Sequence, residues 1–324
     1  MTYQPQDITS ETPTLPKLPG WVTSGRLEPS ENVAFLSGAR FAMLDDILTQ
    51  SGESIPKDLL RNSLALRAAV ATSKLEGRMA READMRDAFF LTAPDQDGIC
   101  HWGPDGDILA FWRKAVRVNL QSKTWIEDVT ALVEQNIGDA VDELLQRAIE
   151  NTQKSGPLSA AAAILNAATE IDDRAEKAAC FLSDVVLAKY FGWERVLPLT
   201  ALHLTKASLR DLRNDEMQSD KAIQIAISQS AETAFRLAKR LVTHANALRA
   251  VAPKLRAKGS DEAVALFLKE NAVAPSGMLS PIIKGTGTAM TSRAARRLCE
   301  RLVKLGVVKE LTGRPTFRLY GIAS

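Results

Sequence analysis

Apolar residues recur every three to four positions between about residue 31 and residue 212, and alternating runs of β-branched residues are nearly absent. This is the period of a helix that buries one face, so the pattern predicts an antiparallel array of helices. Glycine and proline residues mark the breaks between the helices. The predicted helices are residues 31–50, 57–76, 80–91, 106–118, 124–135, 138–152, 158–170 and 174–191.

A stricter pattern follows in residues 219–252, where successive apolar positions are spaced alternately four and three residues apart. This spacing is typical of a coiled-coil seam and predicts one long helix. The seam residues are Ile223, Ile227, Ser230, Ala234, Leu237, Leu241, His244, Leu248 and Val251. Most such stripes pack against the core of their own chain, whereas pairing with a second copy would give a homodimer. We predict the homodimer, because a two-fold partner would place two C-terminal units side by side.

The pattern changes after Gly259 from helices alone to helices followed by two short strands. Thr291 or Ser292 is expected to cap the last helix, and Gly306 to end it. The predicted elements are helices at residues 260–271, 278–283 and 291–305 and strands at residues 307–311 and 316–320. Helices followed by a β-hairpin in this order are typical of a winged helix-turn-helix.

The chain has 324 residues, about twice the length of a typical domain, which favours more than one folding unit. We divide it into an arm that is extended or disordered, a helical domain, a long connecting helix with a basic linker, and a winged-helix domain. These parts span residues 1–30, 31–217, 218–258 and 259–324 respectively. The predicted fold class is therefore mainly α, a helical array followed by a long helix and a C-terminal winged helix-turn-helix with a two-stranded wing.

Composition excludes several classes of protein. Hydrophobic residues make up 45% and charged residues 25%, which are ordinary values for a globular protein. No apolar run approaches the ~18 residues of a membrane span, and the first twenty residues lack the pattern of a signal peptide. The three cysteines are too scattered for a disulfide framework or a zinc knuckle. We therefore expect a cytoplasmic protein without a membrane partner.

The net charge of +2 hides a strong asymmetry along the chain. Residues 236–324 carry a net charge of +12, so the remainder carries −10. A basic segment of this kind favours a polyanionic partner, and we expect duplex DNA. In the predicted helix 291–305, Ala294, Leu298, Leu302 and Leu305 share one face. The opposite face holds Arg293, Arg296, Arg297, Glu300 and Lys304. The candidate DNA-binding residues are Ser292, Arg293, Arg296, Arg297, Lys304, and, on the wing, Arg314 and Arg318.

Arginine suits this role because its guanidinium grips guanine O6 and N7 with two hydrogen bonds and also neutralises phosphates. Arg314 at the wing tip would contact the DNA backbone or the minor groove, and Arg318 a phosphate. Two alternatives remain for the basic face. It could be an ordinary solvated surface, or it could dock onto the acidic remainder of the same chain.

Signals of catalysis are weak. His101, His203 and His244 stand apart from one another and from other metal-ligand residues, and no glycine loop that would cradle phosphates is present. We expect no metal, no cofactor and no adenylyl or phosphoryl transfer. One polar cluster in the helical domain has two interpretations, a surface network or the lining of a pocket. Its residues are Arg67, Thr72, Glu76, Arg78 and Arg86.

Several segments resemble the bacterial domain-of-unknown-function family number 1403. They are RNSLALRAAVATSKLEGRMAREADMRDAFFL, GPDGDILAFWRKA, GWERVLPLTALHL and, at the C-terminal end, TSRAARRLCERLVKLGVVKELTGRPTFRLYGI. The resemblance spans most of residues 31–322. It implies an all-helical body with a C-terminal winged helix, and it implies no activity.

A second resemblance is to Fic-domain proteins, which also combine a helical body with a winged helix. Thr72, Glu76 and Gly77 match the Thr/Ser-x-x-x-Glu-Gly pattern of the inhibitory helix of that family. The active-site motif, His-Pro-Phe followed by Gly-Asn-Gly-Arg, is absent from the chain, and His203 does not stand in a matching context. The resemblance would imply a relative that has lost nucleotidyl transfer.

Taken from the residues, the function expected is that of a DNA-binding transcriptional regulator whose helical body serves for dimerisation or sensing. Two alternatives stay open at this point. One is a degenerate enzyme related to Fic proteins, and the other is a protein-interaction module, each with a winged helix that is only structural.

Overall fold

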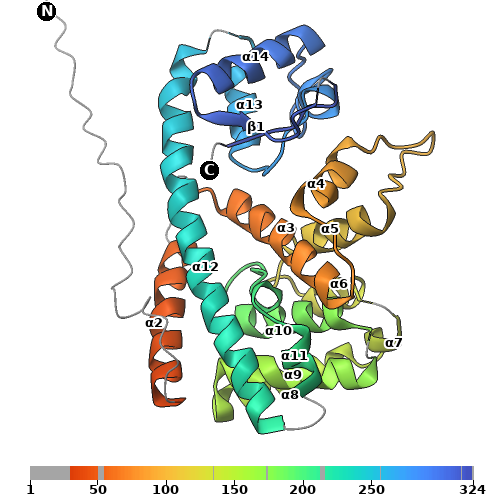
Figure 1. Ribbon diagram of the computed structural model, residues 1–324, viewed down its shortest axis with the longest axis vertical. Helices are drawn as coiled ribbons and strands as arrows, with labels where there is room; N and C mark the ends of the chain where they lie inside the picture. Colours follow the sequence, from red (N-terminus) through yellow and green to blue (C-terminus); the bar gives the residue numbers. More distant parts are fainter. Residues whose placement is uncertain are drawn as a thin grey trace, which may run out of the picture.

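The computed structural model describes residues 30–49, 55–133, 135–172, 174–211, 216–255, 257–314 and 316–322. The predicted arm, residues 1–30, lies outside these ranges except for its last residue. The described part is mainly helical and carries a two-stranded antiparallel sheet near its C-terminal end (Figure 1). The predicted fold class, mainly α, is confirmed.

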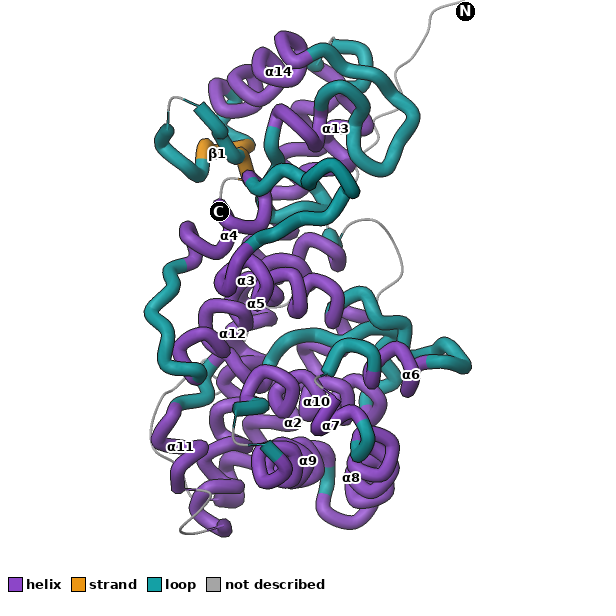
Figure 2. Tube along the Cα trace, turned by 90° about the vertical axis from the view of Figure 1, so that its right-hand side faces the viewer, coloured by secondary structure: helices purple, strands orange, loops and turns teal. Residues whose placement is uncertain are grey.

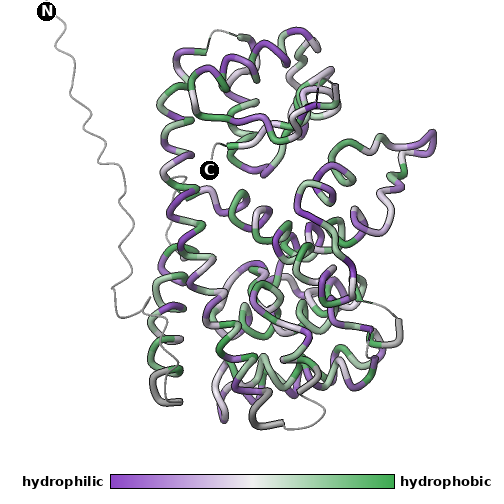
Figure 3. Tube along the Cα trace, in the orientation of Figure 1, coloured by the Kyte–Doolittle hydropathy of each residue, from purple (hydrophilic) through white to green (hydrophobic). Residues whose placement is uncertain are grey.

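The first helices form a helical body, residues 30–211, that surrounds a large apolar core. In it α9 packs against α8 and α10, while α5 packs against α3 and α4. Hydrophobic and hydrophilic residues alternate along the helices, as expected where each helix buries one face (Figure 3). The helices are α2 (Ser30–Thr49), α3 (Lys57–Leu75), α4 (Glu82–Leu91), α5 (Gly103–Ala115), α6 (Trp125–Thr130), α7 (Gln135–Gly138), α8 (Val141–Ser155), α9 (Pro157–Ile171), α10 (Glu176–Tyr190), the short η1 (Thr200–Leu202) and α11 (Lys206–Asp211).

Most boundaries in the helical body agree with the predicted ones within a few residues. The exception is the predicted helix 124–135, which is two short pieces, α6 and α7. The predicted helix 106–118 also lies about three residues earlier, because Gly103 and Pro104 form its first turn.

The long helix α12 (Glu216–Val251) connects the helical body to the C-terminal part of the chain. It forms a column along one side of the molecule, with α2 beside its lower half (Figure 1). Helix α12 packs against several elements of the same chain, α2, α3 and α9 among them. Seven residues of the predicted seam are fully or almost fully buried within the chain, namely Ile223, Ile227, Ser230, Ala234, Leu237, Leu241 and Leu248.

The seam therefore follows the first of its two interpretations, packing against the chain's own core. His244 and Val251, near the end of the helix, are half-buried. The prediction of a homodimer rested on a seam left free for a second copy. Because the chain itself covers that seam, the seam no longer supports the prediction of a homodimer.

After a short turn, η2 (Ala252–Lys254), the chain enters a C-terminal unit, residues 259–322. This unit lies at one end of the molecule, next to α3, α4 and α5 (Figure 2). It contains α13 (Ser260–Phe267), the turn η3 (Pro275–Leu279), α14 (Ser292–Lys304), β1 (Val308–Glu310) and β2 (Tyr320–Ile322). Val308, Lys309 and Glu310 pair antiparallel with Ile322, Gly321 and Tyr320.

Two helices and one strand predicted for the C-terminal unit are wrong in position or type. The helix expected to reach Asn271 ends at Phe267. The helical piece expected at residues 278–283 is the turn Pro275–Leu279, in which Ser276 and Gly277 have non-helical backbone angles. Proline limits helix formation here, since it lacks a backbone N–H and restricts the residue before it. The helix-turn-helix detail of the predicted fold is thus not reproduced, and α13 and α14 are joined by irregular chain.

The second strand is displaced from the predicted residues 316–320 to Tyr320–Ile322. Tertiary pairing decides its position. Val273, which follows α13, donates to the carbonyl of Tyr320 at 2.7 Å and accepts from its N–H at 3.0 Å. Gly321 fits this place because a Cβ there would lie 2.8 Å from the carbonyl oxygen of Asn271.

Among the described residues, no helix is both long enough and apolar enough to cross a membrane.

Candidate nucleic-acid interface

Helix α14 begins with a side-chain cap. Thr291 Oγ1 accepts a hydrogen bond from the backbone N–H of Ala294 at 3.2 Å, so Thr291 is the cap and Ser292 is the first helical residue. Ser292 is exposed, and its hydroxyl lies 3.1 Å from that of Ser280. Gly306, with a φ of 71°, ends the helix as predicted.

The buried face of α14 differs slightly from the predicted one. Ala295, Leu298, Cys299 and Leu302 are buried, whereas Ala294 and Leu305 are half-buried at the edge. The buried face is therefore rotated toward Ala295 and Cys299, whose small side chains allow close packing. Burial raises the pKa of Cys299 to about 12, so its thiol is protonated.

The opposite face of α14 carries a cluster of exposed cations. At ~100° per residue, Arg293, Arg296, Arg297 and Lys304 fall within one half of the helix surface. Sequence reasoning missed a fifth cation, Arg301, on the flank of this face. Within the described residues none of these side chains makes a hydrogen bond or an ion pair. We call the five residues the basic face: Arg293, Arg296, Arg297, Arg301 and Lys304.

The two candidate residues of the wing are placed differently. Arg314 forms an ion pair with Asp87 of α4, with 3.1 Å between Nη2 and Oδ2. Arg318 donates from Nε to the carbonyl of Arg314 at 3.1 Å and lies 3.7 Å from Glu310. Both cations of the loop between β1 and β2 therefore have partners: Arg314 pairs with α4, and Arg318 contacts the loop itself and β1.

Helix α4 anchors this loop from the other side. Arg86, which is 7% exposed, donates from Nη2 to the carbonyl of Leu311 at 2.9 Å. It also lies 3.6 Å from Asp87, the partner of Arg314. Docking onto the acidic body, one alternative left open by the sequence, therefore holds for Arg314. The basic face of α14 makes no such contact with any residue that the structure describes.

A buried ion pair joins the C-terminal unit to the helical body. Arg113 of α5 donates from Nη2 to Glu270 at 2.5 Å, and the two side chains are 3% and 7% exposed. The same guanidinium donates to Asn271 at 3.3 Å and lies 5.3 Å from the ring centres of Phe89 and Phe90. Burial is the main cause that lowers the pKa of Arg113, and the carboxylate of Glu270 opposes it.

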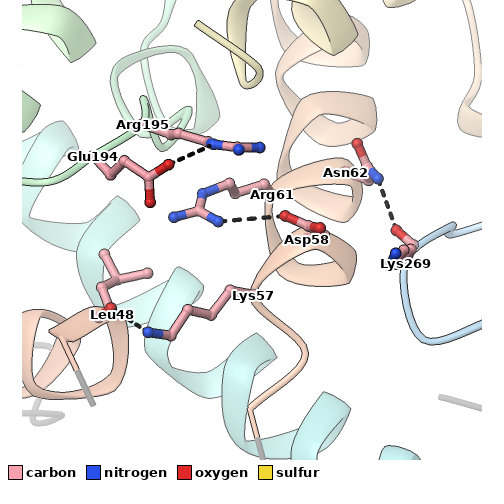
Figure 4. A network of polar contacts seen from close by, with 8 residues as sticks. All are labelled: Leu48, Lys57, Asp58, Arg61, Asn62, Glu194, Arg195 and Lys269. Atoms are coloured by element: carbon pink, nitrogen blue, oxygen red, sulfur yellow. Dashed lines mark hydrogen bonds and ion pairs between the residues drawn. The ribbon is translucent and has the colours of Figure 1, made fainter. Parts of the chain in front are cut away.

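The start of α3 makes further contacts that fix the C-terminal unit and α2 (Figure 4). Asn62 donates from Nδ2 to the carbonyl of Lys269 at 2.7 Å. Lys57 donates from Nζ to the carbonyl of Leu48, at the end of α2, also at 2.7 Å. Arg61 lies between these contacts, and its burial lowers its pKa. These contacts fix α3 to the C-terminal unit on one side and to α2 on the other.

The polar cluster predicted in the helical body does not converge on one site. Thr72 is fully buried, where it donates to the carbonyl of Ala68 and accepts from Trp112 Nε1 at 3.1 Å. Glu76 lies 3.8 Å from Arg78 near the surface. The remaining two members separate: Arg86 binds the wing loop, and Arg67, whose pKa burial lowers, is half-buried on α3.

The histidines are also separate from one another. His203 Nε2 lies 2.8 Å from the hydroxyl of Thr233, and His101 Nε2 lies 2.9 Å from Asp95. In the part of the chain that the structure describes, no three His, Cys, Asp or Glu side chains are grouped as a metal site requires.

Comparison with known proteins gives one family. The family model described as "Protein of unknown function (DUF1403)" matches residues 6–322, nearly the whole chain. No curated protein matches the sequence.

Proposed function

We propose that this chain, which belongs to the DUF1403 family of proteins of unknown function, binds duplex DNA through α14. The observation that carries the proposal is the basic face. Its five cations are exposed and have no partner among the described residues, although the chain elsewhere pairs many of its charges.

The form of α14 suits the major groove, which admits a single α-helix. Its apolar side packs on the C-terminal unit, so the opposite side is presented on rigid secondary structure. Arg293 and Arg296 lie in the first two turns, which are the turns that reach base edges when a recognition helix enters the groove. The free N–H groups at the start of the helix add a positive partial charge that favours phosphates.

The position of α14 supports the same role. The helix lies at the end of the molecule, with the rest of the C-terminal unit between it and the helical body (Figure 1). The ion pair of Arg113 with Glu270 holds that unit to the body. A duplex on the basic face would therefore meet a fixed surface. A DNA-binding protein with a large helical body suits a role in regulation. We therefore propose that this protein acts as a transcriptional regulator.

The proposal is tested by reversing the charge of Arg293, Arg296 and Arg297 to Glu and measuring duplex binding by fluorescence anisotropy at ~0.15 M salt. We expect wild-type protein to bind and the triple variant to lose retention of the duplex, because the contacts to phosphate become repulsive. The matched control reverses three exposed lysines of the helical body and α12, Lys123, Lys154 and Lys221, and so changes the net charge equally.

The control should bind like the wild type. Equal loss in the control and the α14 variant would show that net charge alone attracts DNA. Absence of wild-type binding even at ~0.05 M salt would remove the proposal, since phosphate contacts are strongest at low salt. If binding is observed, sequencing of genomic fragments retained by the protein would identify the sites that a regulator needs.

A further inference from the structure

A cavity of about 760 Å³ lies between α14 and the linker that follows α12. The linker contributes residues of η2 together with Leu255 and Ala257, and α14 contributes one flank of the helix. The lining residues are Pro253, Lys254, Leu255, Ala257, Ala294, Arg297, Leu298 and Arg301. This volume is within the range of ~300–1,000 Å³ found for small-molecule sites.

The lining combines an apolar wall with positive charge. Leu298 is buried, and Leu255 and Ala294 are half-buried, so the wall is apolar and fixed by packing. Lys254, Arg297 and Arg301 are cationic, and none of the described residues of the lining is acidic. Among the described residues these three cations have no hydrogen-bond or ion-pair partner.

The geometry of α14 separates this site from the centre of the proposed DNA surface. At ~100° per residue, Arg301, Ala294 and Leu298 follow one another around the helix, from the edge of the basic face to the buried face. Arg293 lies on the other side of Arg297. Arg297 and Arg301 therefore belong both to the basic face and to the lining of the cavity.

We propose that this cavity binds an amphipathic organic anion, a molecule with an apolar body and a carboxylate or phosphate group. The three cations, which have no partner and no acidic neighbour among the described residues of the lining, favour a negative charge. Guanidinium groups bind carboxylates and phosphates with two hydrogen bonds. The apolar wall formed by Leu255 and Leu298 favours a hydrocarbon or aromatic body over a bare inorganic ion.

The site also gives a means of control. A ligand that engages Arg297 or Arg301 removes a cation from the DNA surface, so ligand and duplex compete. This competition rests on the proposed function, whereas binding of the anion does not.

The probe for the test is 1-anilinonaphthalene-8-sulfonate, an aromatic anion that fluoresces when it enters an apolar site. Its titration into the full chain should show one saturable site per chain. Arg301→Gln and Lys254→Gln should each raise its Kd about tenfold, because each removes a charge-assisted contact. Arg293→Gln, on the same helix but outside the lining, is the matched control and should leave Kd unchanged. Circular dichroism confirms that each variant is folded.

A neutral probe of the same shape, N-phenyl-1-naphthylamine, should bind at least tenfold more weakly than the sulfonate. Equal affinity of the two probes, an equal effect of Arg293→Gln, or no saturable binding would overturn the proposal.

Two competitors then distinguish the sources of the anion. Displacement of the sulfonate by dodecanoate or by dodecyl phosphate supports the proposal and indicates which group the site prefers. Displacement by neither would overturn it.

A labelled duplex provides a separate arm, in which the anion that displaces the probe should also release DNA. If the protein binds the probe as described but no duplex, the proposed function fails and the ligand site stands. If it binds duplex and no probe, the reverse holds.

Discussion

The buried pair between Arg113 and Glu270 gives a quantitative prediction about stability. Substituting Glu270→Gln keeps the shape of the side chain and removes its charge. Arg113 would then remain buried at 3% side-chain exposure without a carboxylate. Lys284, whose Nζ lies 3.7 Å from Glu270, is 49% exposed and contributes little because solvent screens it.

The expected magnitude follows from this burial. Removing one partner of a buried ion pair costs about 3–5 kcal/mol, since the other charge stays desolvated. Glutamine still offers an oxygen to Arg113, so we expect the lower end, about 3 kcal/mol. The free energy of unfolding is measured by urea denaturation followed by circular dichroism.

The control is Glu143→Gln, which breaks an ion pair with Arg147 in α8. Those side chains are 74% and 64% exposed, and the same chemical change should cost below about 0.5 kcal/mol. A cost below about 1 kcal/mol for Glu270→Gln, or one equal to the control, would refute the reasoning that this contact holds the C-terminal unit on the body.

Three further predictions concern other parts of the chain. Burial raises the pKa of Asp184 to about 7, so the folded state holds this proton more tightly than the unfolded state does. The free energy of unfolding should therefore fall as pH rises from about 4 to about 7. Asp184→Asn should flatten this pH dependence, measured by urea denaturation at each pH. An unchanged slope in Asp184→Asn would contradict this. Leu237 of α12 is buried, so Leu237→Asp places a charge in the core and should lower the free energy of unfolding by about 3 kcal/mol or more. The molecular mass of this variant, measured by light scattering, should equal that of the wild type. A change from dimer to folded monomer would instead restore the coiled-coil interpretation. Phe317 is 73% exposed and has a φ of 55°. Phe317→Asn should raise the free energy of unfolding by about 1 kcal/mol, because asparagine tolerates this left-handed conformation better. A free energy of unfolding below that of the wild type would show that the ring makes a stabilising contact.

The helical body was predictable because its information is local. The 3.6-residue period places the helices, and the glycine and proline breaks place their ends. The boundary at Gly156 shows this: α8 ends one residue before it and α9 begins at Pro157. Here the backbone conformation that Gly156 adopts, with a φ of 85°, and the missing N–H of proline dictate the break.

The C-terminal strands were not predictable to the residue because pairing across the chain decides them. Residues 316–320 have the composition of a strand, yet Phe317 adopts a left-handed conformation. The strand itself begins only at Tyr320, which bonds to Val273 of a distant segment. Gly321 then fits against Asn271. None of these contacts leaves a periodic signal in the sequence.

The candidate interface was predictable in part for the same reason. A basic face opposite an apolar one is visible in the helical period, and α14 has it. The buried face is displaced by about one residue, and Arg301 was missed although it follows Arg297 by one turn. The partner of Arg314 could not be foreseen, since Asp87 lies more than 200 residues earlier in the chain.

The salt dependence of duplex binding tests the central claim most directly. The slope of log K against log salt should fall by about 0.9 for each phosphate contact removed. We predict that Arg293, Arg296 and Arg297 changed together to Ala lower this slope by about one to three units. Arg314→Ala should lower the slope by less than the α14 variant does, because Arg314 forms an ion pair with Asp87. A slope unaffected by the α14 variant, or reduced only by Arg314→Ala, would contradict the account that this protein reads DNA through α14.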